Sequence, residues 1–211
     1  MCLSFIPIFT KWLERSQTGP MSNAQTKIAT YADIEALPPH IVGEILFGSL
    51  ITHTRPSPRH GAAASSVGGI LTQGYQFGNG GPGGWIFIVE PELHLGPHIL
   101  VPDIAGWKIE HSSGLADKAW IETPPDWICE VLSPSTERYD RHEKQRVYGT
   151  YSVGYIWHVN PATRLLEVYE RQERGWLLMQ SFQDQDQVSA PPFEAITFNL
   201  GLFWPFDQPA T

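Results

Sequence analysis

The sequence contains only two cysteines, and this scarcity excludes a fold held together by a disulfide framework. Cys129 alternates with Trp127 and Val131, so we expect its side chain to belong to a hydrophobic core. The other cysteine, Cys2, lies in the opening segment. A chain that uses cysteine in this way fits a reducing compartment, and the cytoplasm is the expected location.

Long hydrophobic runs are also missing, so we expect no membrane-spanning segment and no membrane partner. The opening segment Met1–Phe9 is apolar, but it has no basic stretch, contains Pro7 and shows no small-residue cleavage site. We therefore do not expect a signal peptide. Residues 1–25 are expected to form a disordered or non-native extension, with Met21 as an alternative start. Residues 26–206 are long enough for a single domain with a full core.

Positive charge is scarce as well. The chain has 14 lysines and arginines against 22 acidic residues, which gives a formal net charge of -8 at pH 7. This balance excludes a protein that coats DNA non-specifically, because attraction to phosphates is the main sequence-independent contribution to that affinity. A metal-dependent nuclease remains open, since such an enzyme gathers acids around its cations and needs positive charge only where the backbone docks.

Turn-forming residues are plentiful, with 19 glycines and 18 prolines, and they favour short strands joined by tight turns. A helix from Asp140 between two apolar strands predicts a right-handed parallel crossover. The expected elements in chain order are a capped helix at 30–37, a hairpin over 41–53, a helix from 57 to about 76, strands at 85–90 and 92–95 with a return over 99–107, a strand at 127–132, the helix from 140, a strand at 154–159, a hairpin over 165–171 and 176–182, and a covering segment at 193–200.

Two short apolar runs each carry a single acid, Asp103 in the first and Glu130 in the second. Glu130 shares a strand face with Ile128 and Leu132, and a carboxylate in such surroundings is costly unless it meets a cation or a metal. Asp126 offers a competing Pro-Asp pair on the same face. Four residues along a strand span about 13 Å, too far for Asp126 and Glu130 to hold one ion. Asp103 from a neighbouring strand is therefore the expected partner.

Lys144 lies on the apolar side of the helix that follows Glu130, in a stripe with Val147, Tyr148 and Tyr151. Asp140 and Glu143 form a capping-box-like pair at the expected start of this helix. Four further residues make the segment locally basic, and they form either a solvated helix surface or a phosphate-docking face: Arg138, Arg141, His142 and Arg146.

Four other polar residues are open to two interpretations. Glu44 lies inside the first hairpin and is either an exposed strand acid or a further acid of the site. His60 lies in the first turn of the helix from 57, where a capping or surface role is favoured over a ligand role. Glu90 or Glu92 lies opposite Asp103 in the next hairpin and would approach the site, although a structural role is favoured for each.

An ordered series of motifs resembles the Uma-type restriction endonuclease family within the PD-(D/E)XK nuclease superfamily. The likeness covers roughly residues 28–204, and its most specific part is Glu-Val-Leu-Ser-Pro-Ser-Thr from Glu130, followed by Asp-x-x-x-Lys from Asp140. The other matching motifs are Val-Gly-Glu-Ile-Leu-Phe-Gly at Glu44, Ser-Pro-Arg-His at His60, Val-Pro-Asp at Asp103 and Tyr-Ile-Trp-His-Val-Asn-Pro at 155–161.

The resemblance implies a restriction-endonuclease-like fold of class α/β (α+β), with a mixed β-sheet flanked by helices and an N-terminal hairpin and helix. It implies that Asp103 and Glu130 bind metal. The superfamily's lysine would stand at Leu132, and Lys144 is the natural substitute because a lysine on the adjoining helix can reach the same place. We expect a carbonyl near Val131 to complete the ligands of an Mg²⁺ or Mn²⁺ ion, with Glu44 assisting.

The leading hypothesis is therefore a divalent-metal-dependent endonuclease that hydrolyses phosphodiester bonds in DNA, acting as a homodimer. A catalytically inactive nuclease-like scaffold that binds nucleic acid or protein is the alternative, favoured by the missing lysine at position 132 and by the acidic balance. A metal-dependent hydrolase of small phosphate esters is a third candidate. In the inactive scaffold, Asp103, Glu130 and Lys144 would form a buried ion cluster without metal.

Overall fold

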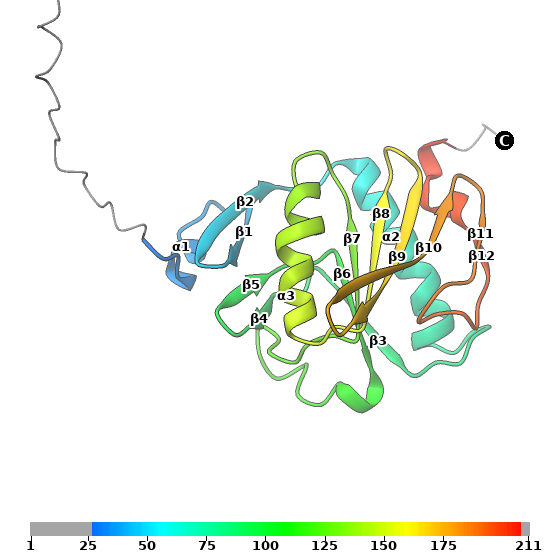
Figure 1. The fold of residues 1–211 in the computed structure, drawn as a ribbon, viewed down its shortest axis with the longest axis horizontal. Coiled ribbons are helices and arrows are strands. Elements are labelled where there is room, and N and C mark those ends of the chain that lie inside the picture. The colour runs from blue at the N-terminus through cyan, green and yellow to red at the C-terminus, as the bar shows by residue number, and fades with distance from the viewer. Residues whose placement is uncertain (1–26, 208–211) are drawn as a thin grey trace, which may run out of the picture.

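The computed structural model describes residues 27–207 and shows a mixed α+β fold built around a six-stranded sheet (Figure 1). The strand order is β10-β9-β8-β7-β6-β3, and β7 and β8 alone among these neighbours run parallel. This confirms the predicted class of a mixed sheet flanked by helices. The strands are β3 Trp85–Val89, β6 Ile104–Lys108, β7 Trp127–Val131, β8 Tyr155–Asn160, β9 Leu165–Gln172 and β10 Gly175–Gln183.

A second, four-stranded sheet has the order β2-β1-β5-β4 and lies beside the main sheet at the N-terminal end of the described chain (Figure 1). It contains the predicted first hairpin, preceded by the short helix α1, Tyr31–Glu35, which begins after a capping box between Thr30 and Asp33. Its strands are β1 Ile41–Leu46, β2 Ser49–Thr54, β4 Leu93–Leu95 and β5 His98–Leu100. A two-stranded ribbon, β11 Gln187–Val188 and β12 Phe198–Asn199, lies near the C-terminus, and 3-10 turns follow at Leu200–Phe203 and Pro205–Asp207.

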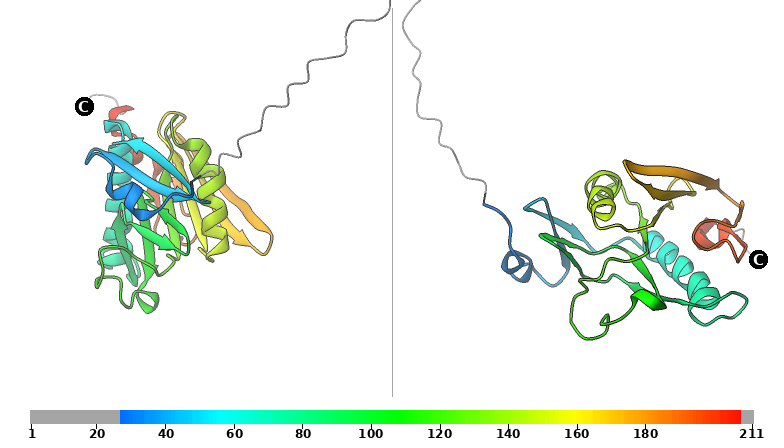
Figure 2. Two further views of the ribbon diagram at one scale, coloured as in Figure 1. Left: turned by 90° about the vertical axis from the view of Figure 1, so that its left-hand side faces the viewer. Right: turned by 60° about the horizontal axis from the view of Figure 1, so that its bottom comes forward.

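Helices cover both faces of the main sheet, as the two views of Figure 2 show. The alternation of β7 separates the faces: Trp127, Cys129 and Val131 pack in a core with the helix α2, whereas Ile128 packs with Val147 of α3. Helix α2 is Pro58–Leu71, continued by a π-helical turn at Thr72–Gln76, and α3 is Gln145–Thr150. Glu130 therefore lies on the α3 face, which is the face predicted from its spacing to Ile128.

The predicted parallel crossover is present. Strands β7 and β8 pair in parallel, with Glu130 opposite His158, and the helical segment that contains α3 connects them. A parallel pair needs a long connection, and this connection returns across the α3 face. The end of β7 that carries Glu130 is consequently covered by the helix that follows it.

The predicted start of this helix at Asp140 is wrong. Helical hydrogen bonding begins earlier, where Glu137 and Asp140 donate from their backbone amides to the carbonyls of Ser133 and Thr136, and a π-helical segment spans Tyr139–Lys144 before α3. Asp140 is therefore not a capping residue but a buried member of the helix, 3% exposed. Its carboxylate lies 3.1 Å from the ammonium group of Lys144, four residues further along, which offsets the charge of the buried acid.

The described part of the chain contains no helix long and apolar enough to span a bilayer. The range predicted to form a single domain, residues 26–206, lies almost wholly within the described residues. These residues contain two adjoining hydrophobic cores. The predicted extension at 1–25 lies outside the described residues.

Candidate metal and phosphodiester site

Asp103 lies just before β6, and two hydrogen bonds with backbone amides hold it in place. Its Oδ2 accepts a hydrogen bond of 2.7 Å from the amide of Val131 on β7, and its own carbonyl accepts one from the amide of Glu90. The first contact joins Asp103 to the segment that carries Glu130. Two acids that lie 27 positions apart in the sequence therefore face one cavity.

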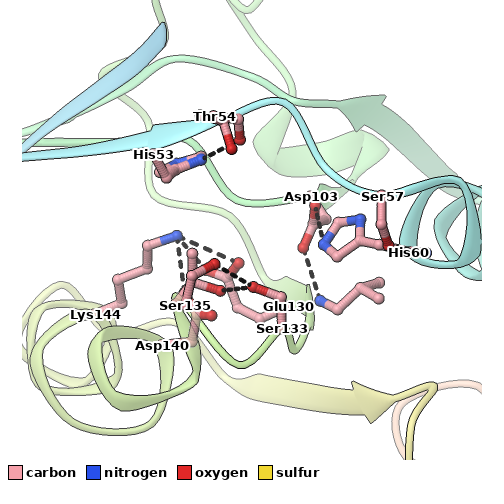
Figure 3. A network of polar contacts seen from close by, with 12 residues as sticks. His53, Thr54, Ser57, His60, Asp103, Glu130, Ser133, Ser135, Asp140 and Lys144 are labelled. Carbon is pink, nitrogen blue, oxygen red and sulfur yellow. Dashed lines mark hydrogen bonds and ion pairs between the residues drawn. The ribbon is translucent and has the colours of Figure 1, made fainter.

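Lys144 brings three carboxylates together on the other side of this cavity (Figure 3). Its Nζ lies 3.1 Å from Glu44 Oε1, 3.1 Å from Asp140 Oδ1 and 3.4 Å from Glu130 Oε1. All four side chains are almost fully buried, with at most 4% exposure. The acids come from β1, from the π-helical segment and from β7, so the ammonium group of one residue links three separate elements.

Glu44 and Glu130 have further partners besides Lys144. Glu44 Oε1 also accepts a hydrogen bond of 2.7 Å from the amide of Val101, and Glu130 Oε1 accepts one of 2.6 Å from the hydroxyl of Tyr148. Glu44 Oε2 lies 3.8 Å from His53 Nε2. Of the two interpretations of Glu44, the structure thus excludes the exposed strand acid, because its side chain is 2% exposed and paired with Lys144.

Burial governs the protonation of this cluster. Burial raises the pKa of the Glu130 carboxyl well above its usual range; Lys144 counteracts this shift, whereas the neighbouring carboxylates of Asp140, Asp103 and Glu44 add to it. Burial alone would lower the pKa of Lys144, but the three carboxylates outweigh it and keep that pKa well above the usual value. One lysine therefore does not offset the negative charge that the cluster can develop, and a further cation would favour the ionised acids.

His60 is the residue whose surroundings differ most from the sequence-based interpretation. The structure places it not as a cap or a surface residue but 8% exposed, with Nε2 3.2 Å from Asp103 Oδ1 (Figure 3). The N-cap of α2 is Ser57, whose side chain accepts from the His60 amide. Burial would lower the pKa of the imidazole, but Asp103 and the Val131 backbone outweigh it, so the pKa is raised.

A cavity of about 340 Å³ unites these groups. Asp103, His60, Glu130, Asp140 and Lys144 line its interior. Three segments with polar side chains line its mouth: the end of β2, the segment leading into α2 and the loop after β7. The polar residues in these segments are His53, Thr54, Arg55, Ser57, Ser133, Ser135 and Thr136. The cavity therefore has acids at its base and hydroxyl and cationic groups at its opening.

The competing acids lie elsewhere. Asp126 accepts from the amide of Lys108 and contacts His111, at the opposite end of β7 from Glu130. Glu92 contacts His94 at 2.7 Å and does not line the cavity, whereas Glu90 does. Sequence reasoning gave other roles to three residues of this site. It favoured a capping or surface role for His60, a capping role for Asp140 and a place in the apolar stripe for Tyr148.

His158, the β8 partner of Glu130, leads to a prediction about acid stability. It is buried, its two ring nitrogens have no hydrogen-bond partner among the described residues, and burial lowers its pKa to about 3. In the unfolded chain the His158 imidazole takes up a proton below about pH 6.5, whereas in the folded chain it does so only near pH 3. As the pH falls through this interval, the free energy of unfolding therefore decreases by up to roughly 1.4 kcal/mol per pH unit.

We expect His158→Leu to reduce the loss of unfolding free energy between pH 7.5 and pH 5.5, as measured by urea denaturation at both values. The matched control is His40→Leu, because His40 is exposed. An unchanged acid slope in His158→Leu would show that another group takes up the proton.

The comparisons with known proteins concern the family and the fold. A crystal structure from Anabaena variabilis, described as "a putative nuclease belonging to DUF820", is similar in fold, with a TM-score of 0.64, 19% sequence identity and coverage of 77% of this chain and 89% of that one. No curated protein sequence matches the chain. The family model Uma2, described as "Putative restriction endonuclease", matches residues 28–201. Because this match covers most of the chain, including Asp103 and Glu130, the protein belongs to the Uma2 family.

Proposed function

We propose that the protein is an endonuclease that uses Mg²⁺ or Mn²⁺ to hydrolyse phosphodiester bonds in DNA. The observation that carries this proposal is the convergence of Asp103 and Glu130 on one cavity with Lys144 beside them. The family and the fold supply the general class of nuclease, and the cavity supplies the chemistry.

The donor set fits a hard divalent cation. Among residues 27–207, no three His, Cys, Asp or Glu side chains form a preassembled metal-ligand group. Magnesium does not require one, since it is commonly held by one or two carboxylates together with water and substrate phosphates. Asp103, Glu130 and the Val131 carbonyl would hold the ion. The excess of buried carboxylates over cations favours an added positive charge.

When bound, the ion would polarise the scissile phosphate and make an attacking water more acidic. The side chains around it have separate roles. His60 and the Val131 amide fix the Asp103 carboxylate, so its remaining lone pairs are oriented before substrate arrives. Lys144 stabilises negative charge that develops at the phosphate, and Glu44 and Asp140 hold its ammonium group at the cavity wall. The hydroxyls of Ser133, Ser135 and Thr136 can donate to phosphate oxygens at the cavity mouth.

Metal dependence gives the direct test. Purified protein is expected to cut supercoiled plasmid or single-stranded DNA in Mg²⁺ or Mn²⁺ and to lose this activity in EDTA, with recovery when the metal is restored. Gel electrophoresis of the products measures the effect. The absence of cleavage across both metals and both DNA forms would count against the proposal.

The inactive-scaffold alternative rests on a different observation, namely that Lys144 pairs with all three buried acids. In that case the cluster would be a structural ion network. Titration calorimetry separates the two cases, because a scaffold would bind neither Mg²⁺ nor Mn²⁺, whereas a nuclease site binds at least one of them in an Asp103-dependent manner.

A further inference from the structure

A second cavity, of about 400 Å³, lies on the other side of α3 from the acidic one. It is formed by three segments that are distant in the sequence: the turn between β1 and β2, the helix α3, and the hairpin between β9 and β10 (Figure 1). Trp176 fixes the hairpin to the helix by donating a hydrogen bond of 2.9 Å to the carbonyl of Gln145. The cavity is therefore a built feature of the fold and not a gap between independent loops.

Two arginines line this second cavity without carboxylate partners. Arg146 and Arg171 are exposed and form no ion pair among residues 27–207. Arg59, Arg141 and Arg164 each pair with an acid, whereas Arg55, Arg138 and Arg174 resemble Arg146 and Arg171 in having no ion pair among residues 27–207. Of these five arginines, only Arg146 and Arg171 line the second cavity. One carboxylate, that of Glu173, also lines this cavity, so the two guanidinium groups leave an excess of one positive charge there, in a chain whose net charge is -8.

Arg146 is also held in a defined position. Its guanidinium carbon lies 4.7 Å from the centre of the Phe47 ring, within the range of a cation–π contact. Such a contact restricts the side chain while leaving its N–H groups free to donate. A planar, preorganised guanidinium suits the recognition of phosphate oxygens.

The two cavities lie at opposite ends of the β1–β2 hairpin. His53 and Thr54 line the acidic cavity, and Phe47 at the hairpin turn lines the second. Five residues separate Phe47 from His53, namely Gly48 of the turn and four residues of β2, so the two positions lie at most about 20 Å apart. This corresponds to about six base pairs at 3.4 Å per base pair. One duplex can therefore reach both cavities.

We propose that Arg146 and Arg171 bind backbone phosphates of the DNA whose scissile phosphodiester enters the acidic cavity. This inference rests on the proposed nuclease function and adds the place where substrate docks. The acidic base of the first cavity repels DNA unless it is compensated. The second cavity supplies that compensation about half a helical turn away from the point of cleavage.

The test measures the affinity for a 30-base-pair duplex by fluorescence anisotropy at several salt concentrations. An Asp103→Asn background with Mg²⁺ keeps the DNA intact. Arg146→Ala and Arg171→Ala are each expected to reduce the slope of log K against log salt by about 0.9 and to weaken binding about tenfold near 0.1 M salt. Arg146→Lys and Arg171→Lys, which keep the charge, should retain most of the slope.

Arg164→Ala is the matched control, because it removes an equal charge from an exposed arginine that is paired with Asp184. It should leave the slope unchanged. If Arg146→Ala and Arg171→Ala match Arg164→Ala while the parent protein binds DNA, the docking site is wrong and the proposed function survives. If the parent protein binds no DNA, both fail.

Discussion

Replacing Asp103 with asparagine is expected to reduce metal-dependent DNA cleavage by about a thousandfold or more. The amide oxygen of asparagine can still accept the hydrogen bond from the Val131 amide, so the local backbone is preserved. What is lost is the negative charge that holds the cation. Charge stabilisation of this kind contributes several kcal/mol, and each 1.4 kcal/mol changes the rate tenfold. Glu130→Gln should have an effect of similar size for the same reason.

The chain offers a close control for this experiment. Glu92 also carries a carboxylate next to an imidazole, with 2.7 Å between Glu92 Oε1 and His94 Nε2, but it lies outside the acidic cavity. Glu92→Gln should cut plasmid DNA at the wild-type rate. Initial rates with saturating metal measure the comparison. Equal losses in Asp103→Asn and Glu92→Gln would mean that the effect is one of general stability and not of the site.

Replacing Lys144 with methionine is expected to lower the free energy of unfolding by about 3–5 kcal/mol, a large effect for a single substitution. Methionine fills much of the volume of the lysine stem, so little of the loss comes from packing. The loss comes from the buried acids of Glu44, Glu130 and Asp140, which lose the cation within 3.4 Å that offsets their charge. Urea denaturation measures it.

The same variant separates a metal site from a purely structural ion cluster. If the cavity binds Mg²⁺, the ion should stabilise Lys144→Met, and its unfolding midpoint should rise with metal concentration. Lys118→Met is the control, because the Lys118–Glu122 pair is exposed and screened by solvent, so its loss should change the free energy of unfolding little. A Lys144→Met protein as stable as the wild type would show that the acids are held neutral without the ammonium group.

The positions of Glu130 and Lys144 could be predicted because both follow from local periodicity. A period of two places Glu130 on the same face as Ile128, and a period near 3.6 places Lys144 with Val147 and Tyr148. The structure confirms both faces. The parallel pairing of β7 and β8 was predictable for a related reason, since a helix between two apolar strands leaves few other arrangements.

His60 and Asp140 could not be assigned in this way. His60 contacts Asp103 across 43 positions of sequence, and nothing in the first turn of α2 indicates which strand end it will face. Asp140 resembles an N-cap in its pattern, and only the π-helical turn, which depends on tertiary packing, turns its carboxylate inward. The periodicity of a single helix or strand therefore predicts Glu130 and Lys144, which are proposed to act on the substrate, more readily than it predicts His60 and Asp140, which hold other side chains in position.

The bond from Lys144 to Glu44 has a consequence for when the chemistry first becomes available. Glu44 belongs to the smaller sheet and Lys144 to a helix on the larger one, and 100 positions separate them along the chain. Contacts between such distant positions carry a high loop-closure entropy and tend to form late in folding. Under the proposed nuclease function, a nascent or partly folded chain would therefore have no competent site, and DNA cleavage would begin only after the two sheets have docked.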